Sequence, residues 1–126
     1  MHSVPIGYEI SATPLQIAMS YAAIANGGFL LKPYVVERIE KHDDTIIKNQ
    51  RNTKKRILSQ SNSEKLGLML SHTVENGSGK SAAIDGWNVA GKTGTSKKLI
   101  DGQYSEKEFI SSFVGYFPYD LSLIHI

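Results

Sequence analysis

The sequence of 126 residues contains no cysteine. This absence excludes a disulfide framework, a zinc site built on thiolates and a cysteine nucleophile. An excess of one charge is also lacking, because 14 Lys and Arg against 12 Asp and Glu give a formal net charge of +2. Such a balance provides no strong attraction to nucleic acid or to an acidic membrane. The composition therefore indicates a globular protein of one domain's length and leaves its function open.

Long apolar runs and clustered histidines are missing as well. The longest apolar run, Ile17 to Ala25, is interrupted by Ser20 and is too short to span a bilayer. No basic stretch leading into an apolar one follows Met1, so no signal peptide is expected at this start, and the chain read from Met1 would be cytosolic. The histidines show no paired metal-ligand spacing of the helical kind, because they stand far apart at His2, His42, His72 and His125.

The first strong helical signal begins at Thr13. Thr13 and Gln16 form a capping box around Pro14, and Gly27-Gly28 supplies the stop. Nearly every position between them is apolar, which predicts a helix buried on most of its faces. One other helix and two hairpins would not supply that cover, and a stable monomer rarely exposes an apolar patch of more than a few hundred Å².

The next third predicts strands and loops. A strand is expected over Phe29 to Glu40, with Pro33 limiting its pairing. His42-Asp43-Asp44 is interpreted as a turn rather than a metal site, and Thr45 to Ile47 as a short returning strand. Lys48 to Arg56 carries five basic residues and no acidic one. It is interpreted as a solvated loop, because a nucleic-acid site would interleave aromatic residues.

A second helix is predicted from a capping box at Ser61 and Glu64 to a stop at Gly77. One stripe at helical spacing is expected to face the core. Its members are Leu66, Met69, Leu70, Thr73 and Val74.

The last third is strand-like. Trp87 to Ser96 and Phe109 to Phe117 are the expected strands, joined by a polar loop over Lys98 to Glu108 with a turn at Asp101-Gly102. Trp87 and Tyr104, which flank the first of these strands, are interpreted as packing residues. The predicted fold class is α+β, with helices covering an antiparallel sheet.

Two short motifs compete as the functional site. Gly77-Ser78-Gly79-Lys80-Ser81 is similar to the end of a phosphate-binding loop, but Val74 stands where the first glycine is required, and a helix precedes it instead of a strand. The segment is therefore interpreted as a flexible glycine linker. A nucleotide-binding protein stays open as an alternative, which ATP-dependent stabilisation would support.

The second motif is Lys92-Thr93-Gly94 within a strand-like run from Val89 to Ser96. Glycines on a strand let another backbone approach closely. A lysine beside hydroxyl groups and backbone N–H groups suits a carboxylate or an oxyanion. These features favour recognition of an extended peptide along a strand edge. The alternative is an exposed lysine on a surface strand, with Thr93 and Thr95 present for their β-propensity.

With this motif the sequence resembles the C-terminal part of the transpeptidase domain of class B penicillin-binding proteins, of division type rather than elongation type. The resemblance runs from about Ile6 to Asp120 in four blocks that keep the family's order. The blocks are Gly7 to Gln16, Tyr21 to Gly28, Val74 to Lys80 running into Val89 to Thr95, and Phe113 to Pro118.

The resemblance implies a partial penicillin-binding (β-lactamase-like) fold and a parent serine D,D-transpeptidase. Such enzymes attack stem peptides ending in D-Ala-D-Ala, cross-link peptidoglycan through an acyl-enzyme, and are trapped by β-lactams. The implied catalytic residues are Lys92, the cation of one cleft wall, and Thr95, whose N–H belongs to the oxyanion hole. Thr93 and Thr95 hydroxyls would bind the substrate carboxylate, and Gly94 would keep the strand edge clear. Alternation along a strand puts Lys92 opposite Thr93 and Thr95, so a sheet edge or strong twist is required.

The family's other two signatures, S-x-x-K with the nucleophile and S-x-N, are absent from the sequence. Residues 1–120 are therefore expected to be a C-terminal fragment that is inactive alone, and residues 121–126 a tail foreign to the family, such as a truncation scar. No cofactor, no metal and no nucleic acid are expected. The implied partners are cell-wall synthesis proteins of the parent, whose domain would lie on the periplasmic side of a bacterial inner membrane.

Two further alternatives stay open. One is a β-lactam sensor or a β-lactamase relative, which the upstream sequence would reveal. The other is a non-catalytic module that binds peptides or glycans and is complete as it stands. Cooperative unfolding of the isolated chain would favour that module, whereas apolar surface accessible to a dye would favour the fragment.

Overall fold

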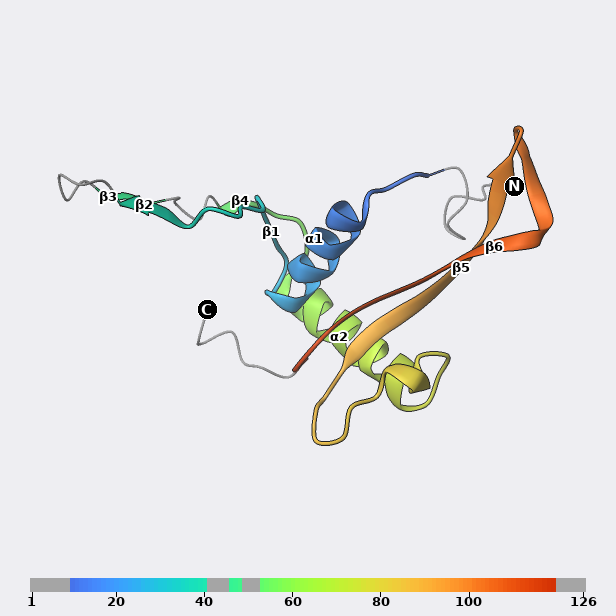
Figure 1. The fold of residues 1–126 in the computed structure, drawn as a ribbon. Coiled ribbons are helices and arrows are strands. Elements are labelled where there is room, and N and C mark those ends of the chain that lie inside the picture. Colours follow the sequence, from blue (N-terminus) through green and yellow to red (C-terminus); the bar gives the residue numbers. More distant parts are fainter. Residues whose placement is uncertain (1–9, 41–45, 49–52, 120–126) are drawn as a thin grey trace.

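The computed structural model describes residues 10–40, 46–48 and 53–119. Two helices lie at its centre, and two thin ribbons of strand extend from them (Figure 1). All strand pairs are antiparallel and each described sheet has two strands, which confirms the predicted α+β class. In chain order the elements are α1 (Pro14–Ala25), β1 (Phe29–Leu31), β2 (Arg38–Glu40), β3 (Ile46–Lys48), β4 (Thr53–Arg56), α2 (Gln60–Glu75), the 3-10 helix η2 (Lys80–Ala82), β5 (Ala90–Ile100) and β6 (Gln103–Tyr116).

Helix α1 begins as its sequence predicts. The Thr13 hydroxyl accepts from the Gln16 N–H at 3.2 Å, and the Thr13 N–H donates to Gln16 Oε1 at 2.8 Å. This closes the capping box and satisfies two backbone donors that the helix itself leaves unpaired. The expected burial is not reached within the described residues, because Ala23 is the one fully buried residue of α1 and Leu15 is 57% exposed.

The predicted strand over 29–40 is divided into two. Strand β1 ends at Leu31, and β2 begins only at Arg38. Pro33 accounts for the break, because it has no N–H to donate to a ladder. Strand β2 pairs with β3, with Ile39 opposite Ile47, which confirms the returning strand. The turn expected at 42–44 lies outside the described residues.

The prediction of a solvated loop over 48–56 is wrong at both of its described ends, because Lys48 is the last residue of β3. Residues Thr53–Arg56 form β4, which pairs with β1 and places Arg56 opposite Phe29. The pairing brings together segments that are more than twenty residues apart in the sequence. The local pattern of a polar, basic stretch does not predict pairing with so distant a strand. Residues 49–52 lie outside the described part.

Helix α2 begins two residues earlier than predicted. Its N-cap is Ser59, whose hydroxyl accepts from the Asn62 N–H at 3.2 Å. Ser61 lies inside the helix and is not its cap, and Glu64 accepts from Gln60 Nε2 at 3.1 Å. Both serines suit a cap, and the earlier one lengthens the helix by half a turn.

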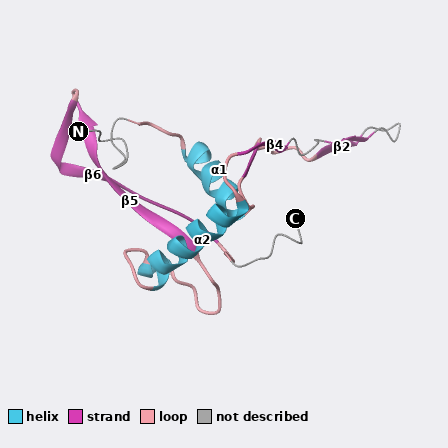
Figure 2. Ribbon diagram, turned by 180° about the vertical axis from the view of Figure 1, so that it is seen from behind, coloured by secondary structure: helices cyan, strands magenta, loops and turns pink. Residues whose placement is uncertain are grey.

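The buried face of α2 also differs from the predicted stripe. Leu70 and Val74 are buried as expected, but Met69 is 65% exposed. The helix packs against β5 (Figure 2). Small residues form much of the buried face and allow this close approach, whereas the sequence predicted that larger apolar side chains would form it. The buried residues of α2 are Ser63, Gly67, Leu70, Ser71 and Val74.

Strands β5 and β6 form one long hairpin, and most of residues 98–108, which the sequence predicted to be a polar loop, belong to its strands. Its turn lies at Asp101 and Gly102, as expected, and both have positive φ, 50° and 80°, as in the tight turns that match strand twist. The strands continue through most of 98–108 because cross-strand ion pairs hold this polar stretch together. The pairs are Lys97 Nζ to Glu106 Oε1 at 2.6 Å and Lys98 Nζ to Glu108 Oε2 at 2.9 Å.

The apolar interior of the described part is small. No large side chain in it is fully buried, and many large apolar side chains are exposed. No helix among the described residues is long and apolar enough to cross a membrane. The buried apolar residues are Ala23, Leu70, Val74, Val89 and Ala90.

Candidate functional site

The Lys92-Thr93-Gly94 motif lies on β5, which has β6 along one edge. Two glycines of β5 leave room for side chains of β6. A Cβ at Gly91 would meet the Phe113 ring at 2.4 Å, and a Cβ at Gly94 would meet Ser112 Oγ at 2.6 Å. The glycines therefore let side chains of β6 lie against the backbone of β5.

The Lys92 side chain bends along β5 toward the residue that follows it. Alternation along a strand would separate it from Thr93. Its ammonium nevertheless donates to the Thr93 carbonyl oxygen at 3.0 Å and, more weakly, to Thr93 Oγ1 at 3.4 Å. Among the described strands β5 pairs with β6 alone, so its second edge is open to the long lysine side chain. The sheet edge that the sequence required is thus present.

Thr95 lies on the same face of β5 as Thr93, because the two are two positions apart on a strand, with Gly94 between them. It is exposed and stands opposite Ser111 of β6. Within the described part of the chain, no hydrogen bond joins its side chain to Lys92 or Thr93. The strand therefore presents two hydroxyls and one ammonium along a single accessible edge, a donor set that suits an anionic group such as a carboxylate.

Ser78 is a site residue that the sequence reading missed. Its Oγ lies 2.8 Å from Thr93 Oγ1, although the two residues are fifteen positions apart in the sequence. It sits in the turn after α2, where the N–H groups of Gly77 and Gly79 both donate to the Thr73 carbonyl oxygen, at 3.1 and 2.9 Å. The interpretation of this segment as a flexible linker is therefore wrong. The sequence signal that could have indicated Ser78 is a hydroxyl residue between two glycines directly after a predicted helix.

The turn at 77–81 also lacks the setting of a phosphate-binding loop. Helix α2 precedes it and the three-residue helix η2 follows, whereas such loops connect a strand to the start of a long helix. The described residues contain no group of three or more His, Asp or Glu side chains that could hold a metal ion.

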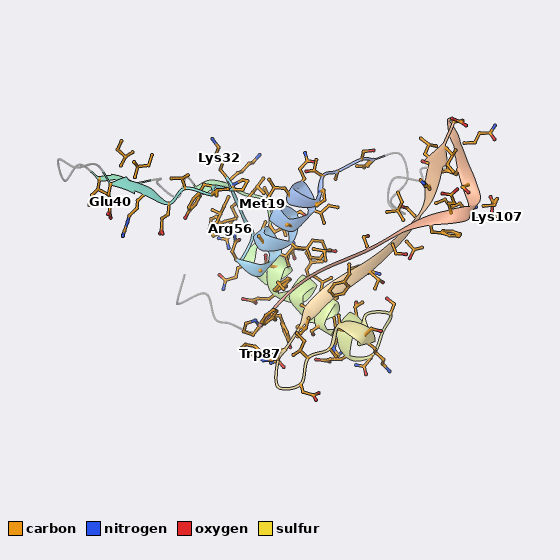
Figure 3. All side chains as sticks on the ribbon, viewed as in Figure 1. Met19, Lys32, Glu40, Arg56, Trp87 and Lys107 are labelled. Atoms are coloured by element: carbon orange, nitrogen blue, oxygen red, sulfur yellow. The ribbon has the colours of Figure 1, made fainter. Side chains whose placement is uncertain are left out.

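Trp87 packs beside the site rather than in it. Its ring meets that of Phe117 edge to face, with centroids 5.3 Å apart and an interplanar angle of 77°. Figure 3 shows Trp87 next to the loop that leads into β5. Tyr104, the second residue interpreted as packing, stands opposite Leu99 far along the hairpin and is 43% exposed.

Comparison with known proteins identifies this arrangement. The family described as "Penicillin binding protein transpeptidase domain" matches residues 1–123. The chain belongs to this family. Over most of its length it is part of a class B transpeptidase domain.

The curated relatives are much longer than this chain. Stage V sporulation protein D of Bacillus subtilis is 37% identical over 90% of the chain, which is 18% of that protein. The "Peptidoglycan D,D-transpeptidase FtsI homolog" of Mesostigma viride is 33% identical over 89% of the chain, which is 21% of its length. The chain thus spans about a fifth of these curated relatives.

Solved penicillin-binding structures share its fold. Penicillin binding protein 3 of Mycobacterium tuberculosis, complexed with aztreonam, superposes with a TM-score of 0.86 and 28% identity. That match covers 93% of this chain and 28% of the other. The D,D-transpeptidase domain from Eggerthella lenta gives a TM-score of 0.73 at 31% identity, covering 94% and 28%. The expected penicillin-binding fold is confirmed.

Proposed function

We propose that the chain supplies the lysine-bearing wall of a serine D,D-transpeptidase that cross-links peptidoglycan stem peptides through an acyl-enzyme. The observation that carries this proposal is the single edge of β5 on which Lys92, Thr93 and Thr95 lie. The relatives' names supply the reaction, since several are called peptidoglycan D,D-transpeptidases. The substrate is a stem peptide ending in D-Ala-D-Ala.

Each group on the edge has one task in this proposal. The Lys92 ammonium stands near the nucleophile and the terminal carboxylate of the substrate. The hydroxyls of Thr93 and Thr95 donate hydrogen bonds to that carboxylate, and the Thr95 N–H belongs to the oxyanion hole. Losing one oxyanion donor typically costs about 2.7–4 kcal/mol of transition-state stabilisation. Gly94 leaves room for the substrate backbone to approach the strand.

The nucleophile comes from residues outside this sequence, in which no S-x-x-K occurs. The exposed apolar side chains support this part of the proposal, because they suit contact with further parts of a transpeptidase domain. Leu15, Ile10 and Leu68 are 57%, 62% and 50% exposed. Residues 1–120 then form the C-terminal part of the domain.

The relatives' names also suggest the setting. A protein named as an FtsI homolog supports a division-type role. Structures of a neighbour with aztreonam and with ampicillin support β-lactams as inhibitors of the complete enzyme. The enzyme works at the periplasmic face of the bacterial inner membrane, together with other cell-wall synthesis proteins.

A fluorescent penicillin tests the proposal. The 126-residue chain alone should take up no covalent label, because it offers no activated serine. A transpeptidase domain that contains this chain should be labelled, and prior ampicillin should block the label. Replacing Lys92 with Met in that domain should abolish labelling, whereas the Lys107→Met control on the far hairpin should not. Covalent labelling of the chain alone would contradict the proposal.

A further inference from the structure

Two polar groups, the Ser78 hydroxyl and the Lys92 ammonium, converge on one hydroxyl of the site. Thr93 Oγ1 lies 2.8 Å from Ser78 Oγ and 3.4 Å from Lys92 Nζ. An ammonium has only donors, whereas a hydroxyl has one donor and two acceptor positions. Lys92 therefore occupies one acceptor position of Thr93. If Ser78 donates, it occupies the other, and the Thr93 proton must point elsewhere.

The turn that contains Ser78 is held by hydrogen bonds to the end of α2. Two backbone hydrogen bonds tie the N–H groups of Gly77 and Gly79 to the Thr73 carbonyl oxygen at the end of α2. A Cβ on Gly77 would meet that same oxygen at 2.9 Å, which is too close for any side chain, and a Cβ on Gly79 would make a tight contact with it at 3.1 Å. Gly79 is buried as well. The turn is therefore a close-packed support, and α2 itself packs on β5.

We propose that Ser78 is a positioning residue, which donates its proton to Thr93 Oγ1 and thereby directs the Thr93 proton to the carboxylate of the substrate or β-lactam. This inference rests on the proposed function, in which Thr93 binds that carboxylate. Ser78 does not itself touch the ligand. Ser78 acts by fixing the rotamer of Thr93 and the direction of the Thr93 hydroxyl proton. Without Ser78, the Thr93 side chain can rotate and donate its proton to another acceptor.

The contact itself is tested on the 126-residue chain by NMR of threonine methyl groups. The three-bond couplings that report χ1 of Thr93 should indicate one rotamer in the wild type. In Ser78→Ala they should become averaged, and in Ser78→Thr, which keeps the hydroxyl, they should return to wild-type values. Ser81→Ala, which removes an exposed hydroxyl from the neighbouring helix η2, is the matched control. Unchanged Thr93 couplings in Ser78→Ala would overturn the proposal.

The consequence for binding is tested on a transpeptidase domain that contains this chain. Ser78→Ala should lower the acylation efficiency of benzylpenicillin about tenfold, the upper range for one hydrogen bond, and Ser78→Thr should restore it. The loss should be much smaller for the methyl ester of the same penicillin, which has no carboxylate. It should also vanish when Thr93 is already replaced by Val, because Ser78 then has no hydroxyl to position.

The outcomes separate this inference from the proposed function. An equal loss with benzylpenicillin and its ester, or a loss that persists in the Thr93→Val background, would show a merely structural role for Ser78 and overturn the inference. A wild-type domain that no penicillin acylates would instead defeat the proposed function. The NMR couplings would then still decide whether Ser78 sets the conformation of Thr93.

Discussion

The guanidinium of Arg56 lies over the ring of Phe29, with Cζ 4.8 Å from the ring centroid. The same guanidinium donates through Nη2 to the Gly27 carbonyl oxygen and through Nε to the Leu58 carbonyl oxygen, both at 3.1 Å. One side chain thus joins the end of α1, the first residue of β1 and the residue before the Ser59 cap. Figure 3 shows Arg56 at this junction, with Glu40 far out on the β2–β3 ribbon.

Replacing Arg56 with Ala should therefore loosen the junction of the two helices. The loss of two hydrogen bonds and a cation–π contact should lower the free energy of unfolding by about 1–3 kcal/mol. Arg56→Lys should recover only part of it, because an ammonium lacks the planar fork that reaches two carbonyl groups. Urea denaturation measures both. Lys55→Ala, the next residue along β4, is the control, and an equal effect there would contradict this role.

Two glycines with positive φ should respond differently to alanine. Gly28 (φ 101°) has no room, since a Cβ would lie 2.1 Å from the Leu58 carbonyl oxygen, whereas Gly86 (φ 80°) has nothing within 4 Å. Gly86→Ala should cost about 1–2 kcal/mol from backbone strain alone. Gly28→Ala should lower the free energy of unfolding by clearly more, because the backbone at Leu58 must also move. Thermal unfolding compares the two, and equal losses would refute the steric argument.

Gly94→Ala should separate stability from function. The added methyl group comes too close only to Ser112 Oγ, an atom that can rotate away. The free energy of unfolding should therefore change by less than about 1.5 kcal/mol. In a domain containing this chain, penicillin acylation should nevertheless fall, because the methyl group narrows the edge that the ligand approaches. Melting temperature and acylation rate are measured on the same preparation. Restoration by Ser112→Ala would instead show that crowding between β5 and β6 caused the loss.

Stability at alkaline pH should depend on Tyr116. Burial raises the pKa of its hydroxyl above the usual value, and the nearby charge of Tyr21 raises it further. In the pH range above about 10, the unfolded chain loses this proton before the folded one does. The stabilising contribution is therefore present below that pH and is lost as pH rises through the folded pKa.

Tyr116→Phe should flatten this alkaline decline. Denaturation midpoints measured at several pH values from 8 to beyond the usual tyrosine pKa, about 10, provide the test. Tyr34→Phe is the matched control, since Tyr34 is 42% exposed. The same decline in Tyr116→Phe as in the wild type would assign the effect to other groups.

Local signals in the sequence predicted the elements whose partners lie nearby. The Thr13 capping box needs only Gln16, three residues away, and the Asp101-Gly102 turn needs only residues that tolerate positive φ. The order of the motif blocks led to the family, because each block is a contiguous string. The second cap shows the limit of such signals, since Ser59 and Ser61 satisfy the same pattern and only the packed helix selects Ser59.

By itself the sequence determined the α+β class, the first helix, the hairpin turn and the lysine-threonine strand of the site. Tertiary structure decided what depends on distant partners: that Arg56 belongs to a strand opposite Phe29, and that Ser78 meets Thr93 fifteen residues away. It also decided that the Lys92 ammonium reaches Thr93 across an open sheet edge. The physical reason is that capping and turn preferences act within a few residues, whereas pairing and side-chain contacts across strands depend on which surfaces the folded chain brings together.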